Sequence, residues 1–458
     1  MTPEYAAFLA AKAPRPQAVG ITPGAMPGHL FDYQQAVAAF ALEQGRCGVF
    51  LDTGLGKTRI DLECLRQSAE ASNGRALLLT PLAVARQIEK EGRELGYPVR
   101  VIRSQDDAGE GINICNYDRL ELLRPEAFGA IALDESSILK SFTGTTTRAR
   151  IASFAEHRFR FAFTATPAPN DHMELGQHSE FLGIMASNEM LARWFVSDQT
   201  QMGRYRLKGH GEAHFWEWMA SWSRCAETPE DLGFDGSAFV LPPLNVKRHR
   251  AYGDLRAPAG ALFMSDLSAT NIHDVKRQTA EARADAVARL VEAEPGESWV
   301  VWCDTDYEAD ALIAKMPPGA VEVRGSQPIE KKEAALASFA EGEARIIVTK
   351  PSVAGMGLNW QHAARVAFAG RSFSYEAWYQ AVRRCWRFGQ KRPVDVHLIV
   401  AEGEDQIGRV IDRKAEDHAK MKRAMAEAMK RAMRRSDVKV PYNPTHIARM
   451  PEWLTSAA

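Results

Sequence analysis

The sequence predicts an α/β protein of two parallel-sheet lobes, with a helical insertion between them and a helical tail at the C-terminus. Two stretches, at about 30–183 and 298–400, alternate short apolar strands with helical segments, which is typical of parallel sheets covered by helices. The stretch between them lacks this alternation and holds four of the ten tryptophans. The 458 residues are therefore expected to form an N-terminal arm (1–28), a first lobe (29–183), an insertion (184–297), a second lobe (298–405) and a basic tail (406–458).

Each lobe is expected to contain a series of short strands that are buried on both faces, because their residues are almost all apolar. The strands of the first lobe are expected at Val49–Leu51, Ala76–Thr80, Val99–Ile102, Ile112–Cys115, Ala130–Leu133 and Arg160–Phe163. The strands of the second lobe are expected at Trp299–Cys303, Ala320–Val323, Arg345–Thr349, Arg365–Ala369 and Asp395–Val400.

The first strand leads into a glycine turn that is typical of a phosphate-binding loop. The stretch Phe50–Thr58 reads FLDTGLGKT, and a helix is expected to begin at Thr58. Gly54 and Gly56 let the backbone bend so that successive N–H groups converge on a polyphosphate at the positive end of that helix. Lys57 can reach the β- and γ-phosphates, and the hydroxyl of Thr58 can bind Mg²⁺. The loop therefore predicts ATP and Mg²⁺ as cofactors.

An Asp-Glu pair follows another apolar strand of the first lobe. Asp134 suits a Mg²⁺ ligand, and Glu135 suits the activation of an attacking water. Such a pair also occurs at strand ends without catalytic meaning. Its place downstream of a phosphate loop favours the catalytic interpretation.

The second lobe carries arginines that suit a leaving phosphate. In QAVRRCWRFGQ, which begins at Gln380, Arg384 and Arg387 lie three residues apart and share one face of a helix. Helical arginines are usually solvated, so this pattern alone is weak. If these two act in catalysis, they must reach the nucleotide across a cleft, which couples hydrolysis to closure of the lobes.

Nine short motifs follow one another in order between about 30 and 411. They are YQ (Tyr33-Gln34), DTGLGKT, LLLTPLAVARQ, INICNYDRL, LDESSILK, FTATP, VEVRGS, SVAGMGLNW and QAVRRCWRFGQ. Their order resembles that of the superfamily-two helicase-like ATPases, specifically the Swi/Snf-type DNA translocases, in a compact form similar to phage or prophage members.

The resemblance implies two RecA-like lobes with ATP and Mg²⁺ in the cleft, and double-stranded DNA tracked across both lobes without strand separation. It implies that Gln34 reads the adenine and that the nucleotide is bound by Gln34, Gly54, Leu55, Gly56, Lys57, Thr58 and Gly357. It implies nucleic-acid contacts, mostly to phosphates, at Thr80, Arg86, Thr164, Thr166, Arg324, Ser326, Lys350 and Ser352.

The chain departs from the family pattern at several places near the nucleotide motifs. Leu51 stands at the start of the loop, and Asp52 and Thr53 follow it where acidic and Met residues are common. Ser136-Ser137 replace the Ala or Gly and His that follow the Asp-Glu pair. Arg383 replaces the small or acidic residue before Arg384.

The sequence leaves more than one interpretation for the middle segment and for the C-terminal tail. The tryptophans of the middle segment predict either a helical insertion with its own core or an aromatic surface for a nucleic acid or partner. The tail is expected to be one helix from about Ile407 to Arg435, with Met421, Met425, Met429 and Met433 in one stripe. That stripe predicts docking on the protein's own body, a partner-binding helix or a basic helix on DNA.

Composition adds little about the partner. The net charge is −1, but residues 406–458 hold twelve Lys or Arg against six Asp or Glu, which suits a polyanion. The six cysteines form no Cys-x-x-Cys pair, and no apolar run is long enough to cross a membrane. We therefore expect the protein in the reducing cytoplasm of a bacterial or phage-infected host cell.

The rivals to a translocase are a strand-separating DNA or RNA helicase, a DNA-binding scaffold with a vestigial ATPase, and the motor subunit of a restriction system with a methylase or nuclease partner.

Overall fold

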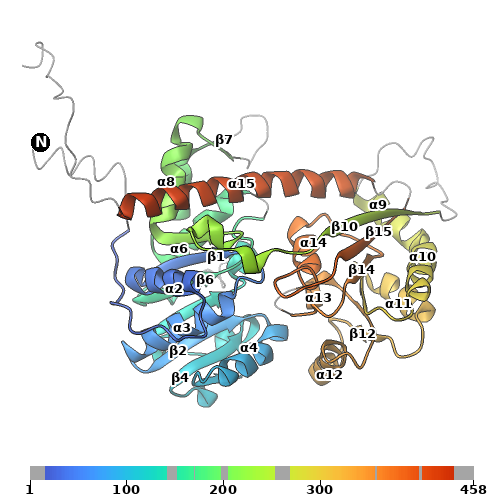
Figure 1. Ribbon diagram of the computed structural model, residues 1–458, viewed down its shortest axis with the longest axis horizontal. Helices are drawn as coiled ribbons and strands as arrows, with labels where there is room; N and C mark the ends of the chain where they lie inside the picture. Colours follow the sequence, from blue (N-terminus) through green and yellow to red (C-terminus); the bar gives the residue numbers. More distant parts are fainter. Residues whose placement is uncertain are drawn as a thin grey trace, which may run out of the picture.

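Two parallel sheets, each covered by helices, lie beside one another, and one long helix runs along both (Figure 1). The computed structural model describes residues 16–141, 152–169, 171–197, 205–252, 269–355, 358–401 and 405–437. The predicted fold class, two parallel-sheet α/β lobes with additional helices, is confirmed.

The first sheet has seven strands in the order β3-β4-β2-β5-β6-β1-β9, and all neighbours are parallel. Its strands are β1 (Arg46–Leu51), β2 (Arg75–Thr80), β3 (Val99–Val101), β4 (Gly111–Asn116), β5 (Ala130–Asp134), β6 (Phe159–Phe163) and β9 (Ser223–Ala226). One face is covered by α2 (Asp32–Gln44), α3 (Lys57–Glu70) and α4 (Leu82–Glu94). The other face carries α6 (Leu175–Leu182), α7 (Ser187–Trp194) and α8 (Glu212–Trp222). Because both faces are covered, β5 and β6 are buried along their whole length and are apolar apart from Asp134 and Arg160.

The second sheet has six strands in the order β10-β15-β14-β11-β13-β12, again with parallel neighbours. Its strands are β10 (Leu244–Ala251), β11 (Trp299–Trp302), β12 (Val321–Val323), β13 (Ile346–Thr349), β14 (Arg365–Phe368) and β15 (Val394–Ala401). Its helices are α9 (Ala269–Gln278), α10 (Ala280–Ala293), α11 (Asp306–Lys315), α12 (Ile329–Ala340), α13 (Pro351–Ala354) and α14 (Tyr375–Val382). All eleven expected strands overlap an observed strand of these two sheets.

The middle segment contains the expected helices and also strands that tie it to both lobes. β9 is an edge strand of the first sheet and β10 an edge strand of the second, and β7 (Phe195–Ser197) pairs with β8 (Tyr205–Leu207). The side chains of Trp194, Trp216, Trp218 and Trp222 are buried in the apolar core of the first lobe. They therefore serve packing, and they form no exposed aromatic surface.

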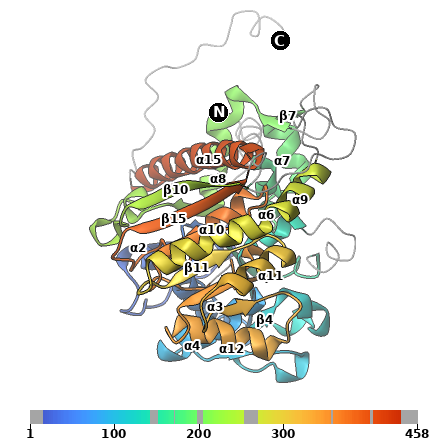
Figure 2. The same ribbon diagram turned by 90° about the vertical axis from the view of Figure 1, so that its right-hand side faces the viewer.

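The C-terminal helix α15 (Asp405–Asp437) contacts both lobes (Figure 2). Met421, Met425 and Met429 are buried in the same core as the tryptophans, whereas Ile407 and Ile411 pack on Tyr375 of α14 in the second lobe. The methionine stripe is thus packing on the protein's own body; the side chain of Met433 lies outside the described residues. None of the described helices is long and apolar enough to cross a membrane.

Candidate functional site: a charged cleft between the lobes

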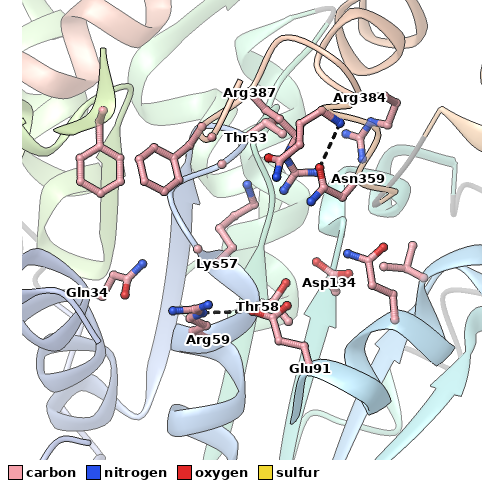
Figure 3. Close-up of a pocket in the computed structure, with 18 of the residues that line it drawn as sticks. Gln34, Thr53, Lys57, Thr58, Arg59, Glu91, Asp134, Asn359, Arg384 and Arg387 are labelled. Atoms are coloured by element: carbon pink, nitrogen blue, oxygen red, sulfur yellow. Dashed lines mark hydrogen bonds and ion pairs between the residues drawn. The ribbon is translucent and has the colours of Figure 1, made fainter. Parts of the chain in front are cut away.

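A cavity of about 420 Å³ lies where the phosphate loop of the first lobe faces the second lobe. Its size is within the range of small-molecule sites in proteins. Figure 3 shows Lys57 at its centre, with Arg384 and Arg387 on one side and Thr58 and Asp134 on the other. The lining residues are Phe31, Gln34, Thr53, Gly54, Gly56, Lys57, Thr58, Arg59, Val84, Gln87, Glu91, Asp134, Glu135, Phe239, Asn359, Gln361, Arg384, Arg387, Phe388 and Gly389.

The loop between β1 and α3 has the backbone shape that the sequence predicted. Gly54 and Gly56 have φ values of 93° and 72°, which favour glycine. A Cβ on Gly56 would also lie 2.2 Å from Nε2 of Gln34, so the loop and this glutamine are packed together. Lys57 Nζ donates to the carbonyls of Leu51 (2.9 Å) and Asp52 (3.2 Å), at the end of β1. The ammonium is thereby held at the mouth of the loop.

The two carboxylates lie at the end of β5, opposite the loop. Thr80 donates to Oδ2 of Asp134 (2.9 Å), and Tyr117 donates to the Asp134 carbonyl (2.6 Å), which fixes this strand end. Glu135 has a φ of 50°, the one left-handed non-glycine residue in the described part of the chain. Such strain is typical of functional positions. Burial, and then the negative charge of Glu135, raise the pKa of Asp134 to about 7.

The two arginines reach the cavity from the segment after α14. Both donate to the carbonyl of Leu358, Arg384 at 3.1 Å and Arg387 at 3.0 Å, and Arg384 also donates to Oε1 of Gln380 at 2.7 Å. These bonds orient the guanidinium groups but bring them no negative charge. Burial, and then the neighbouring Arg384, lower the pKa of Arg387 to about 9. Burial, against the opposing effect of Glu135, lowers the pKa of Lys57 to about 8.

Burial is the largest cause of the lowered pKa values of Lys57, Arg384 and Arg387, so the cavity holds three desolvated cations. A polyphosphate would pair with them. The same cavity holds Thr58, Asp134 and Glu135, and hydroxyl and carboxylate oxygens are the ligands that Mg²⁺ prefers. Burial, and then the Glu135 carboxylate, raise the pKa of Asp134, so a divalent cation held by Asp134 and Thr58 would favour the ionised carboxylate. The residues present thus fit Mg²⁺ together with a polyphosphate.

Gln34 lies at the other end of the cavity, with aromatic rings beside it. Its Oε1 accepts from the N–H of Phe31 (3.0 Å), and its Nε2 donates to the Leu55 carbonyl (3.1 Å). One lone pair of Oε1 stays available for a base. The rings of Phe239 and Phe388 stack with centroids 4.4 Å apart and join the two lobes. Phe31 packs edge-on against Phe239, so apolar rings surround this end.

The residues expected to contact nucleic acid are not brought together as one group. Thr80, Thr164 and Thr166 are buried, and Thr166 donates to Glu376 of α14 (3.4 Å). Ser326 and Ser352 are exposed. The three basic side chains already have acidic partners: Arg86 pairs with Glu89 (3.0 Å), Lys350 with Asp306 (2.9 Å), and Arg324 with Asp310 (2.6 Å) and Glu322. A nucleic-acid role for these eight residues stays a prediction.

Several lining residues were not expected from the sequence. Gly357, which was expected at the nucleotide, lies outside the described residues, whereas its near neighbours Asn359 and Gln361 line the cavity. Arg59 and Glu91 form an ion pair (3.0 Å) on the side of the cavity that the first lobe provides. Asn359 lies in the motif SVAGMGLNW and Phe388 in QAVRRCWRFGQ, so the sequence could have indicated both as cavity residues. Phe239 lies in none of the nine motifs.

Comparison with known proteins supports the interpretation of the fold. Residues 282–389 match the helicase conserved C-terminal domain. The structure of Dbp5 from S. cerevisiae bound to RNA and ADP BeF3 has a TM-score of 0.57 at 12% identity, over 87% of this chain and 93% of that chain. A single-residue variant of Dbp5 with the same ligands has a TM-score of 0.58 at the same identity and coverage. A search of curated proteins found no match.

At 12% identity the structural similarity establishes the fold, that of two tandem RecA-like lobes. The domain match lies within the second lobe and the end of the segment before it. Residues 282–389 are thus similar to a helicase C-terminal domain, and the two-lobed fold agrees with that similarity.

Proposed function

We propose that this protein is a Swi/Snf-like motor that hydrolyses ATP to ADP and phosphate to move along double-stranded DNA. The observation that carries the ATPase part is the charge of the cleft. Lys57, Arg384 and Arg387 have depressed pKa values and face Asp134 and Glu135 across one cavity of about 420 Å³. Few ligands other than a metal-bound polyphosphate satisfy both sets of charges at once.

The residues of the first lobe would bind the nucleotide. The N–H groups of the loop and Lys57 would hold the β- and γ-phosphates, and Thr58 and Asp134 would hold Mg²⁺. Mg²⁺ bound there would neutralise charge on the phosphates. Glu135 would accept a proton from the attacking water. Gln34 would accept a hydrogen bond from the base through the remaining lone pair of its amide oxygen.

The residues of the second lobe would act on the transition state. Arg384 and Arg387 would stabilise the charge that develops on the γ-phosphate. Because they already lie against the cavity, their guanidinium groups need little reorganisation at the moment of reaction. Both lobes are therefore required for turnover.

The choice of duplex DNA rests on the motif resemblance, above all on the ending Arg387-Phe388-Gly389-Gln390, and on the two-lobed fold. The structure of Dbp5 contains RNA, so a strand-separating RNA helicase is the main rival. The test is the steady-state ATPase rate with no nucleic acid, single-stranded DNA, duplex DNA and duplex RNA. We expect duplex DNA to raise turnover about tenfold, equivalent to ~1.4 kcal/mol off the barrier.

A strand-displacement assay separates the two motors. The proposed enzyme should remove a third strand from a DNA triplex in an ATP-dependent reaction and leave a forked duplex paired. Stimulation by RNA or single strands alone, or opening of the fork, would overturn the translocase in favour of a helicase. The absence of ATP hydrolysis under all four conditions would overturn the ATPase itself.

A further inference from the structure

A buried cluster of charges lies directly behind the phosphate loop, on the side away from the cavity. The Asp52 carboxylate accepts hydrogen bonds from Tyr379 Oη and from Arg383 Nη2 (2.8 Å). Lys422 Nζ lies 3.5 Å from the same carboxylate and donates to Tyr379 Oη (3.1 Å). These four residues, Asp52, Tyr379, Arg383 and Lys422, are called the loop cluster below.

The charged members of the loop cluster are almost fully buried, with exposed fractions of 8% for Asp52, 4% for Arg383 and 9% for Lys422. Glu227 lies 3.3 Å from Lys422, so two cations face two carboxylates. Burial alone would raise the pKa of Asp52, but Arg383 and then Lys422 hold that pKa below its ordinary value. Asp52 is therefore ionised at neutral pH and paired with Arg383 and Lys422.

The members come from three separate parts of the chain. Asp52 follows β1 in the first lobe, Tyr379 and Arg383 belong to α14 and its C-terminal end in the second lobe, and Lys422 lies in α15. A buried ion cluster is weak evidence for stability, because apolar residues of similar size often stabilise as much. Its best-attested use is to select one arrangement of elements over others. The arrangement selected here is that of the two lobes.

The helix α15 reinforces this arrangement. Its first turns pack on the second lobe through Ile407 and Ile411, and its later turns pack on the first lobe through Met421, Met425 and Met429. Lys422 lies among the residues that pack on the first lobe, at the point where α15 passes the phosphate loop. Figure 1 shows α15 running along one side of both lobes.

The loop cluster also touches the groups that would perform the chemistry. Arg383 Nη2 donates to the carbonyl of Thr53 (2.8 Å), and Lys57 donates to the carbonyl of Asp52 (3.2 Å). Arg383 directly precedes Arg384, so the backbone that Arg383 anchors to the loop is the backbone that carries the cavity arginines. The Asp52–Arg383 pair therefore links the loop to the segment that carries the cavity arginines.

We propose that the loop cluster is an internal tether that holds the two lobes closed before nucleotide or nucleic acid binds, with Arg383 as a positioning residue for Arg384 and Arg387. The effect on turnover rests on the proposed ATPase function; the closed state does not. Closure of lobes in enzymes is commonly induced by substrate. The loop cluster would add a link within the chain itself between the loop and the segment that carries the cavity arginines.

Pulsed electron paramagnetic resonance tests the closed state without requiring hydrolysis. All six cysteines are buried, so spin labels can be directed to Glu94→Cys on α4 and Glu333→Cys on α12, which are exposed. These helices face one another on the edge opposite α15 in both views (Figures 1 and 2). Without nucleotide, the labelled full-length protein should give one narrow distance distribution.

Arg383→Gln should broaden that distribution and move it to longer distances, and ADP with beryllium fluoride and Mg²⁺ should narrow it again. The matched control is Lys430→Gln, which breaks a different ion pair of α15, with Asp231 (3.0 Å), and should change nothing. A narrow distribution for Arg383→Gln, or a broad one for the parent protein, would overturn the tether. If Arg383→Gln does not fold, Lys422→Gln carries the same test.

Turnover gives a second, independent measurement. Arg383→Gln should lower the ATPase rate without nucleic acid about tenfold, while nucleotide affinity stays within a few-fold. Asp52→Asn should do the same, and the double variant should be no slower than either single variant, because the two act as one unit. Additive losses would show that Arg383 does not act through Asp52. If the parent protein hydrolyses no ATP, the proposed function fails, and the tether is decided by the distance measurement alone.

Discussion

The affinity of the cleft for ATP should fall above neutral pH, because the pKa of Lys57 lies just above neutrality. In the free protein, burial lowers the pKa of Lys57 to about 8. A bound polyphosphate would restore this ammonium to its charged form. Binding above pH 7.5 should therefore take up protons, and the sign of the linkage makes ATP bind more weakly as pH rises.

The size of the effect follows from the titration of Lys57. Between pH 7.5 and 9.0, the protonated fraction of Lys57 falls about eightfold, whereas the guanidinium of Arg387 keeps its charge. Solvent screening reduces the effect, so we expect a loss of about fivefold in affinity, or ~1 kcal/mol. Above pH 7.5 the γ-phosphate is already ionised and contributes little.

Titration calorimetry at pH 8.5 measures this directly. The apparent binding enthalpy should differ between buffers of high and low ionisation enthalpy in the direction of proton uptake. Lys57→Met should bind more weakly, and its affinity should be nearly independent of pH over this range, because the variant lacks the titrating ammonium. For the parent protein, an affinity that is constant from pH 7.5 to 9.0 would refute the reasoning, because it would show that Lys57 does not titrate in this range.

Four further outcomes are expected. Lys57→Ala should keep less than about a tenth of the turnover, because the mutation deletes the cation of the loop; a higher rate in a steady-state assay would contradict the phosphate-loop assignment. Glu135→Gln should bind ATP normally and turn over at least ~100-fold more slowly, whereas a joint loss of binding would indicate a structural role. Met425→Ala should destabilise the fold by about 2–5 kcal/mol, which a lower melting temperature would show, and should leave DNA affinity unchanged. An unchanged melting temperature would contradict docking of the tail. His418 is buried and its pKa is lowered to about 3, by burial first and then by Lys422. Since the unfolded chain takes up this proton below about pH 6.5 and the folded chain does not, stability present above pH 6.5 should fall by ~1.4 kcal/mol per pH unit as the pH decreases. His418→Gln should reduce the shift in the denaturant midpoint between pH 7.5 and 5.5, and an equal shift would count against this origin.

The sequence predicted strands well where burial on both faces demands apolar runs, as in β5 and β11. It did not indicate β9 and β10, for a physical reason. β9 is the four-residue stretch Ser223–Ala226, which becomes a strand only because β1 offers it a partner. β10 is an edge strand whose residues Asn245–Arg248 are exposed, so it lacks an apolar run.

The same distinction divides the candidate site. Gly54, Lys57 and Asp134 could be predicted because their chemistry is local: each follows a strand whose carboxyl end must face the ligand. The contact among the three aromatic rings at one end of the cavity could not be predicted. Phe31, Phe239 and Phe388 lie far apart in the sequence and meet only in the folded protein. No local pattern encodes that placement.

Arg383 shows how a departure from a family pattern can mark such a placement. On the sequence it is a large cation where a small or acidic residue is usual, and nothing nearby explains it. In the fold it lies 2.8 Å from the Asp52 carboxylate of the opposite lobe, beside Lys422 of α15. A buried arginine without that carboxylate would strongly destabilise the fold. Arg383 is therefore tolerated only where Asp52 and α15 surround it. The motifs that predict the chemistry of the cleft are local. The ion pair beside them is not local, because it forms only when the two lobes lie next to one another. A change at Asp52 should consequently disturb the arginines of the other lobe as much as the loop in which it lies.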